Sequence, residues 1–187
     1  YGVMITSAGA GYSQWKDLAL TRWRADTTLE DGGTWLYLQD RDRGSLTSAT
    51  FQPLASPAGD PQAFFYPYKA EFHRQEDDLA LKLEVAVAAE DDVEIRQLVL
   101  TNHGDNVRRL RVTSYGEVVL APQEADQRHP AFNKLFIESE YEPELNALVF
   151  HRRPRSVQEE PVFLVHMLVT NSTARSAVRY SSDRALF

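Results

Sequence analysis

Apolar and polar side chains alternate along residues 79–87, LALKLEVAV, and this alternation constrains the fold more than any other feature of the chain. A β-strand turns successive side chains to opposite faces, so the leucines and valines share one face while Lys82 and Glu84 share the other. Residues 93–100, VEIRQLVL, begin with the same alternation and then shift phase at Leu98, which predicts a β-bulge. The intervening AEDD is typical of a turn, so the two runs predict an antiparallel hairpin.

Strand-like runs recur along the rest of the chain, and no stretch has the apolar period of a helix of normal length. A single helical turn within residues 15–23 is the most that the sequence offers. Eleven strands, with longer loops at 55–63 and 121–133, predict an all-β antiparallel sandwich with little or no helix. The further strands are expected at residues 1–6, 33–40, 46–54, 64–75, 107–121, 134–140, 147–153, 161–169 and 176–182.

Composition excludes several classes of function. The chain has 187 residues, which suits one domain and allows a stable core without a metal or a disulfide. Its formal net charge of −7 disfavours a nucleic-acid or anionic-lipid surface, because phosphate binding needs clustered Lys and Arg. Cysteine is absent, which fits a reducing compartment. We therefore expect no nucleic-acid partner.

The hydropathy of the chain and its first residues give expectations about where the protein is located in the cell. No apolar run approaches the ~20 residues that span a bilayer, so a soluble piece is expected. The sequence begins on YGVMIT without an initiator Met, which indicates a fragment of a longer protein. We expect a cytoplasmic domain, whose parent protein is either cytoplasmic or held in the bacterial inner membrane.

Motifs for catalysis and metal binding are weak. A glycosidase needs two carboxylates about 5 to 9 Å apart, one of them with a raised pKa. The carboxylates on expected loops, none with a sequence mark of a raised pKa, are Asp26, Asp31, Asp40 and Asp126. The five histidines show no HxH or HxxxH spacing, so no metal or other cofactor is expected, and only His129 is a candidate to face a ligand. The basic run HRRPR at 151–155 favours a solvent-exposed strand edge over a phosphate or partner site.

An aromatic and ionic block at residues 12–26, YSQWKDLALTRWRAD, is the strongest candidate for a binding surface. Two of the three tryptophans stand there among charged side chains. The residues concerned are Trp15, Arg22, Trp23, Arg24 and Asp26. Sugars stack their C–H faces on such rings, while arginine and aspartate hold the hydroxyl groups. A ligand platform, an interdomain contact and a packed corner of the core all remain open for this block.

Four blocks of the chain resemble a known family. They are YGVMITSAGAGYSQWKDLALTRWRAD, GTWLYLQDRDRGSLTSATFQP, DDVEIRQLVLTNHGDNVRRLRVTSYGEVVLAPQEADQRHPAFNKLFIESEY and HRRPR, at residues 1–26, 33–53, 91–141 and 151–155. In order and spacing they resemble the β-supersandwich domain of glycosyltransferase family 36, now grouped with glycoside hydrolase family 94. The version in cyclic β-1,2-glucan synthetases is the most similar, and the resemblance runs from residue 1 to 187.

The resemblance implies a galactose-mutarotase-like antiparallel β-supersandwich that forms one domain, residues 1–187, of a larger multidomain enzyme. In that family the domain is expected to bind carbohydrate and precedes an (α/α)6 barrel, which supplies the catalytic Asp and the phosphate site and has no counterpart here. In related disaccharide phosphorylases it also builds the dimer interface. The family continues into more strands after SSDRALF, so the last strands are expected to be missing.

Matching motif by motif, the resemblance implies candidate ligand-facing or barrel-facing residues in TRWRAD, YLQD, FQP and HPAF. With the tryptophan of YSQW they are Trp15, Arg22, Trp23, Arg24, Asp26, Asp40, Gln52 and His129, and the same motifs contain Thr21 and Pro53. Where the family reads Trp-Ser before its A-x-x-Q-P block, this chain has Leu46-Thr47-Ser48, which implies a weaker sugar contact at that edge.

Three hypotheses about function follow. In the first, the domain is a non-catalytic carbohydrate-binding module of a cyclic β-1,2-glucan synthetase or related β-glucan phosphorylase, and it docks on the barrel and helps to position glucan or an oligosaccharide. In the second, it is a structural or dimerisation module that contacts the barrel or a second protomer without binding sugar. An autonomous mutarotase-like enzyme is the weakest hypothesis, because nothing in the sequence brings together a pair such as His129 and Glu117.

Overall fold

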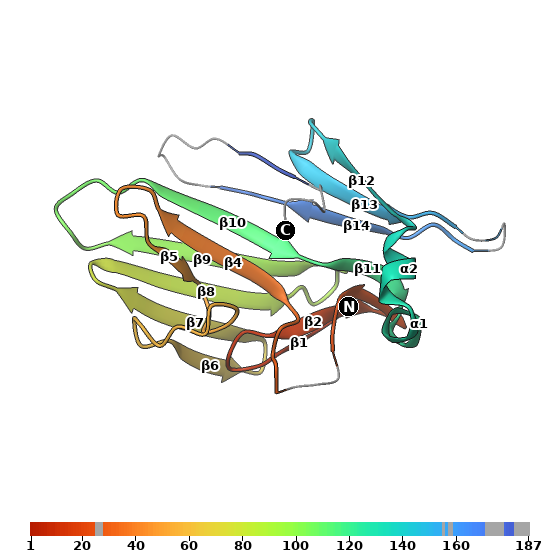
Figure 1. Ribbon diagram of the computed structural model, residues 1–187, viewed down its shortest axis with the longest axis horizontal. Helices are drawn as coiled ribbons and strands as arrows, with labels where there is room; N and C mark the ends of the chain where they lie inside the picture. Colours follow the sequence, from red (N-terminus) through yellow and green to blue (C-terminus); the bar gives the residue numbers. More distant parts are fainter. Residues whose placement is uncertain (25–27, 155, 157–158, 171–177, 182–187) are drawn as a thin grey trace. The chain divides into compact units, whose positions relative to one another are not determined.

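The computed structural model describes residues 1–24, 28–154, 156, 159–170 and 178–181, and nearly all of its regular structure is β-strand (Figure 1). The chain forms two compact units, Tyr1–Arg128 and His129–Phe187. The strand pairs of both units are antiparallel, so the predicted all-β antiparallel fold is confirmed. That residues 1–187 form one domain of a larger enzyme stays a prediction.

A four-stranded sheet contains the most regular alternation in the first unit (Figure 1). In order across the sheet, its strands are β6 (Gln62–Tyr66), β7 (Lys69–Glu76), β8 (Leu79–Val87) and β9 (Glu94–Asn102). The β8 strand coincides with the predicted range and buries Leu79, Leu81, Leu83 and Val85, each at most 4% exposed. The single strand expected at 64–75 is instead the hairpin of β6 and β7, with its turn at residues 67–68.

Two smaller sheets complete the first unit. One has the order β1 (Gly2–Ile5), β2 (Gly11–Trp15), β3 (Leu18–Thr21) and β11 (Val118–Pro122). The other has the order β10 (Leu110–Gly116), β4 (Thr34–Asp40) and β5 (Leu46–Ser48). The run predicted as one strand at 107–121 is therefore divided, because β10 pairs with β4 while β11 pairs with β3.

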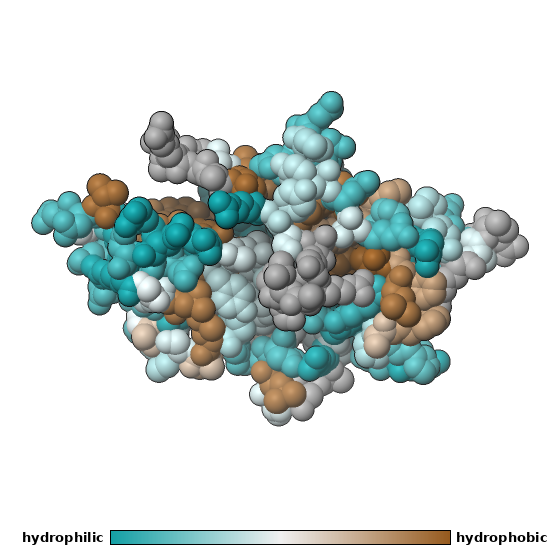
Figure 2. Space-filling view, turned by 45° about the horizontal axis from the view of Figure 1, so that its top comes forward, coloured by the Kyte–Doolittle hydropathy of each residue, from teal (hydrophilic) through white to brown (hydrophobic). Residues whose placement is uncertain are grey.

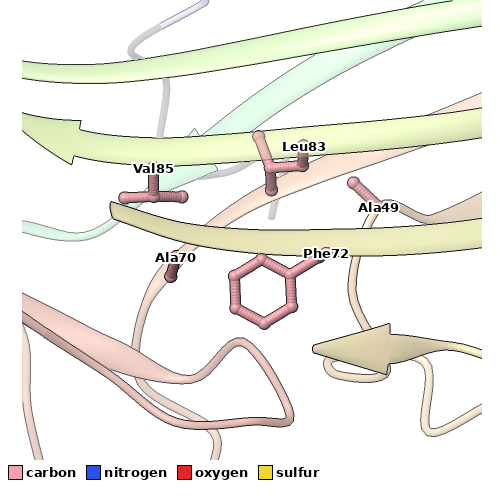
Figure 3. Packing of buried hydrophobic residues seen from close by; sticks show 5 residues of the cluster. All are labelled: Ala49, Ala70, Phe72, Leu83 and Val85. Atoms are coloured by element: carbon pink, nitrogen blue, oxygen red, sulfur yellow. The ribbon is translucent and has the colours of Figure 1, made fainter. Parts of the chain in front are cut away.

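The core lies where the inward face of the β6–β9 sheet packs against β1, β4 and the segment after β5. Figure 3 shows the side chains of one buried cluster close together, namely Ala49, Ala70, Phe72, Leu83 and Val85. Partly buried Val3, Ile5 and Leu36 pack against this cluster from β1 and β4. Burial of this apolar surface is the main favourable contribution to folding of the unit.

The β-bulge predicted in residues 93–100 is wrong. The register between β8 and β9 is continuous, with Leu98 opposite Leu83 and Leu100 opposite Leu81. The phase shift arises because Glu94 and Arg96, rather than Ile95, occupy the inward face of β9. Glu94 accepts hydrogen bonds from the Ser13 hydroxyl at 2.5 Å and from Arg96 Nε at 2.5 Å, so the two inward charges are satisfied inside the sandwich.

Two short helices occupy the region expected to be a loop at 121–133. They are α1 (Gln123–Arg128), at the end of the first unit, and α2 (Pro130–Lys134), at the start of the second. Their lengths of 6 and 5 residues agree with the prediction of little helix. None of the described helices is long and apolar enough to cross a membrane.

The second unit contains a three-stranded sheet with the order β12 (Ile137–Glu142), β13 (Ala147–Arg152) and β14 (Phe163–Met167). Because β13 is the central strand, the exposed edge predicted for HRRPR is wrong at Arg152, which is 5% exposed. Of the strand expected at 176–182, residues 176, 177 and 182 lie outside the described residues, and 178–181 are not in a strand. On the face seen in Figure 2, hydrophobic residues form separate groups among hydrophilic ones.

The packing of β8 predicts the effect of truncating its leucines. Leu83→Ala should lower the free energy of unfolding by about 2–5 kcal/mol, because the 2%-exposed side chain leaves a cavity between the sheets. Leu46→Ala removes the same atoms from a residue that is 54% exposed and should cost no more than about 0.5 kcal/mol. Urea unfolding followed by circular dichroism measures both, and equal losses for the two variants would contradict the assigned core.

Candidate functional site

The aromatic and ionic block at 12–26 forms a tight hairpin of β2 and β3, in which Trp15 lies opposite Leu18. Lys16, in the turn, has a φ of 53°, so the chain reverses there instead of continuing as a helical turn. Asp26 lies outside the described residues. The remaining predicted site residues of this block are all described. The structure separates the two tryptophans but brings Arg22 and Arg24 to one pocket.

The two tryptophans do not lie on one surface. Trp15 shares a strand face with Ser13, and its Nε1 donates a hydrogen bond to Asp92 Oδ2 at 2.6 Å, in the turn between β8 and β9. Trp23 lies beside the ring of Tyr12, with a centroid separation of 5.5 Å. Because Tyr12 and Ser13 are neighbours in β2, they point to opposite faces of the strand. A platform made from both indoles together is therefore not present, although each ring is only partly buried.

Arg22 is held by two carboxylates at the end of β3. Its Nε and NH2 donate to the two oxygens of Asp126 at 3.0 Å each, and NH1 pairs with Glu117. Burial works to lower the pKa of Arg22, but the hydrogen bonds to Asp126 and the charge of Glu117 outweigh it and raise the pKa. The bidentate pair fastens β3 to α1, so much of the hydrogen-bonding capacity of Arg22 is used inside the fold.

Arg22 and Arg24 nevertheless line the same small pocket, which has a volume of about 100 Å³. Its other side-chain walls are Asp31, Trp35, Tyr115 and Glu117. At about 30 Å³ per water molecule, the space holds roughly three waters, enough for the hydroxyl edge of a sugar but not for a whole ring. We call this the Arg22 pocket.

The groups of the Arg22 pocket differ in how firmly they are held. Trp35 is 3% exposed, whereas the side chain of Arg24 is 56% exposed and donates to Asp31 Oδ2 at 2.6 Å. Burial and the neighbouring charge of Glu117 raise the pKa of Tyr115, which keeps its hydroxyl protonated and able to donate. A guanidinium has five N–H donors, so Arg24 has donors beyond the one that it gives to Asp31.

The sequence interpretation missed Trp35 and Tyr115 as pocket residues. They lie directly opposite each other on β4 and β10, strands that are far apart in the sequence. Their alternation with inward-facing Leu36 and Ser114 indicates only that both point away from the β6–β9 sheet. Pairing between the strands, which local patterns do not report, is what brings them to the two arginines.

Asp40 has a structural position. It is 3% exposed; its Oδ1 accepts from the backbone N–H groups of Asp42 and Arg43 at 2.8 and 3.0 Å, and its Oδ2 accepts from Arg108 Nε at 2.9 Å. These bonds close the turn between β4 and β5 and tie it to the residues before β10. The hydrogen bonds from Arg43 and Arg108 lower the pKa of Asp40 to about 2.

Gln52 and His129 are not brought to the Arg22 pocket by anything that the structure determines. The backbone N–H of Gln52 donates to the Ala8 carbonyl at 2.9 Å, and its carbonyl accepts from the Thr50 hydroxyl at 2.6 Å. His129 is exposed and precedes α2 in the second unit, where its carbonyl accepts from the N–H of Asn133. Ligand-facing roles for both residues stay predictions.

The described residues offer no arrangement for metal binding, since no three His, Asp, Glu or Cys side chains among them converge. Among the described residues, the carboxylates with a shifted pKa are all shifted downward by hydrogen bonds from basic groups or backbone N–H groups. They are Asp40, Asp42, Glu71 and Glu84. A glycosidase acid needs the opposite shift, so these four carboxylates are suited to binding and structure rather than to proton donation.

Comparison with known proteins agrees with this architecture. The sequence model of the glycosyl hydrolase 94 supersandwich domain matches residues 1–187. The chain belongs to this family. The supersandwich domain is 35% identical over 187 residues to cyclic beta-(1,2)-glucan synthase NdvB of Rhizobium meliloti (strain 1021), a match that covers 100% of this chain and 7% of that protein. It is 23% identical over 150 residues to the N,N'-diacetylchitobiose phosphorylase of Vibrio proteolyticus, covering 76% of this chain and 18% of that protein.

The buried position of Asp40 predicts a pH dependence for the supersandwich domain. Since its pKa is lower in the folded chain than its ordinary value of 3.8, the ionised form stabilises the fold above about pH 4, and this contribution is lost as the pH falls toward about 2. Asp40→Asn should therefore lower the free energy of unfolding at pH 6 by more than it does at pH 2. Urea unfolding at the two pH values tests this, and an equal loss at both would contradict the proposed ionised state.

Proposed function

We propose that this supersandwich domain is a non-catalytic carbohydrate-binding module of a larger glucan-acting enzyme, and that it docks on that enzyme's (α/α)6 barrel and helps to position the glucan. The observation that carries the proposal is the Arg22 pocket, where two guanidiniums, two carboxylates, an indole and a phenol line one space. Sugar hydroxyls both donate and accept hydrogen bonds, so they need neighbouring donors and acceptors. Polar groups placed beside aromatic rings are typical of sites for small polar ligands.

The names of the relatives suggest the first ligand to test. One relative is named for the synthesis of cyclic β-1,2-glucan and the other for the phosphorolysis of a diacetylated chitobiose. Since the chain spans only 7% and 18% of these proteins, their reactions are not attributed to this domain alone. We take linear β-1,2-gluco-oligosaccharides as the probe because the match to the glucan synthase covers the whole chain.

The downward pKa shifts at the four described carboxylates support a binding role over a catalytic one. Asp40 is occupied by Arg108, and Glu71 by Lys69, so neither is poised to give a proton at neutral pH. In the proposed arrangement, the bond-making groups belong to the barrel, and the supersandwich domain supplies affinity and orientation.

Titration of the chain with β-1,2-gluco-oligosaccharides, followed by NMR shifts and calorimetry, tests the proposal. Arg24→Gln should weaken binding about tenfold or more, because hydrogen bonds from charged groups contribute roughly 1.5–3 kcal/mol. Arg43→Gln is the matched control, since Arg43 forms a similarly exposed ion pair with Asp77 at 2.9 Å, away from the pocket. The absence of any shift at millimolar sugar would exclude direct binding.

A specific observation favours the alternative function, a structural or dimerisation module. Arg22 and Asp40 are both engaged in ion pairs within the fold, so two of the predicted contact residues serve the domain itself. In this alternative Trp23, which is only partly buried, packs against the barrel or a second protomer.

The two functions predict different behaviour for Trp23→Ala. If the domain is an interaction module, the Trp23→Ala variant should lose binding to a separately produced barrel or lose its dimer. Size-exclusion chromatography with light scattering measures both. Sugar titration curves for wild type and variant complete the comparison. Docking lost while sugar binding is retained would show that Trp23 serves the interface, whereas sugar binding lost while docking is retained would place Trp23 at the glucan.

A further inference from the structure

The outward face of the β6–β9 sheet has features that the Arg22 pocket does not share. The two surfaces lie on opposite sides of the first unit, because Trp35 and Tyr115 alternate with residues that face this sheet. Across the sheet, Gln62, His73, Lys82 and Val99 are register partners, and all four point outward. The inward partners in the next row are Phe72, Leu83 and Leu98, which belong to the core.

An open cavity of about 300 Å³ lies on this outward face. Its walls include Gln62, His73, Lys82 and Thr101, together with the turn at residues 59–60. The turn approaches β7 closely at Gly59, where the carbonyl accepts from Gln75 N–H at 2.9 Å and an added Cβ would lie 2.5 Å from the Gln75 carbonyl oxygen. Glycine is required there by this contact and by a φ of 75°.

The size and lining of the cavity fit a sugar unit. Its volume lies at the lower end of the range for ligand pockets, and equals about ten waters at roughly 30 Å³ each. The amide of Gln62 and the hydroxyl of Thr101 can each donate and accept, and Lys82 adds donors. Val99 and the stem of Lys82 give the same space an apolar side.

Exposed aromatic rings continue from the cavity along the edge strand β6. Phe64 is 40% exposed and its ring lies 5.0 Å from that of His73, while Tyr66 is 45% exposed and stacks on Tyr68 at 6.2 Å. Phe64 and Tyr66 are two positions apart, so they point to the same face about 7 Å from each other. From Gln62 to Tyr66 the strand covers roughly 13 Å, which is longer than a single sugar ring.

The charges on this face compensate one another. Lys69 contacts Glu71 at 2.5 Å and Glu84 at 3.1 Å, and Lys82 contacts Glu84 at 2.6 Å and Glu71 at 3.5 Å. Two ammonium groups and two carboxylates therefore cancel, and Glu71 also accepts from His73 at 3.1 Å. Asp60, at the turn that lines the cavity, adds one negative charge. A surface without net positive charge does not attract phosphate, sulfate or nucleic acid. Lysine and glutamate at its centre also make it unlike the core of a protein–protein interface.

We propose that the outward face of the β6–β9 sheet is a second carbohydrate site, which binds a neutral oligosaccharide with one unit in the His73–Lys82 cavity and further units along Phe64 and Tyr66. The proposal rests on the proposed function for the class of ligand but is independent of the Arg22 pocket. In this proposal the aromatic rings stack on the faces of the sugar units, and the compensated charges disfavour anionic saccharides.

The test is titration of the chain with linear β-1,2-gluco-oligosaccharides, with binding measured by calorimetry and located by NMR shifts. Phe64→Ala should weaken binding roughly tenfold or more, as expected for an aromatic anchor. Phe163→Ala is the matched control, because Phe163 is also exposed on an edge strand and lies 5.8 Å from a histidine ring, that of His151. Gln62→Ala, at an exposed position on β6, provides a second variant with little risk to folding and should also weaken binding.

The outcomes separate this proposal from the proposed function. Sugar binding that is unaffected by Phe64→Ala and Gln62→Ala, with shifts confined to the Arg22 pocket, would overturn the second site and leave the proposed function standing. No binding by the wild-type chain would overturn both. An oligoglucuronate of the same length should bind more weakly than the neutral sugar, and equal or tighter binding would overturn the assignment of a neutral ligand.

Discussion

Along β8, four apolar side chains lie in one line on the inward face of the sheet, and their packing against β1, β4 and the segment after β5 holds the first unit together. Leu83 and Val85 meet Ala49 and Leu36 in one cluster, while Leu79 and Leu81 meet Leu38 in another. Strand alternation then determines the direction of the remaining side chains on these strands. Because every second residue is committed to the core, the residues between them form the outward faces on which ligands or partners can bind.

A second feature is the number of arginine–carboxylate pairs that join elements distant in sequence. Arg22 links β3 to α1, and Arg108 links the turn after β4 to the approach to β10. Arg74, with no exposed side-chain surface, pairs with Glu76 and donates to the carbonyls of Ser48, Thr50 and Ser56. The planar guanidinium can satisfy several acceptors at once, so it suits places where loops of one sheet cover the edge of another. Charged residues that look like binding groups in the sequence are thereby used to hold the sandwich together.

The groups available for binding are charged side chains that are more exposed than those in the buried arginine–carboxylate pairs. Arg24 is more exposed than Arg22, although the two are only two positions apart and line the same pocket. On the opposite side, the Lys69–Glu71 and Lys82–Glu84 pairs lie on an open sheet face. They compensate each other's charge there, and the face stays accessible to solvent. Two surfaces of different chemistry therefore belong to one unit: a narrow polar pocket beside Trp35, and a wide face with exposed rings along β6.

Alternation in the sequence was enough to predict the all-β class, the exact range of β8 and the scarcity of helix, because alternation with period two is a local consequence of burying one face of a strand. Its blocks also indicated the glycoside hydrolase family 94 supersandwich. Which charged side chains are available for binding, by contrast, depends on contacts between distant parts of the chain. The phase shift at Glu94 and Arg96 looked like a bulge, because no local pattern reveals that Ser13 and Thr34 supply inward partners. In the same way, Trp15 and Trp23 share one block of the sequence but lie on different surfaces, while Trp35 and Tyr115 meet through strand pairing. Long-range pairing depends on how sheets stack, and that information is distributed over the whole chain.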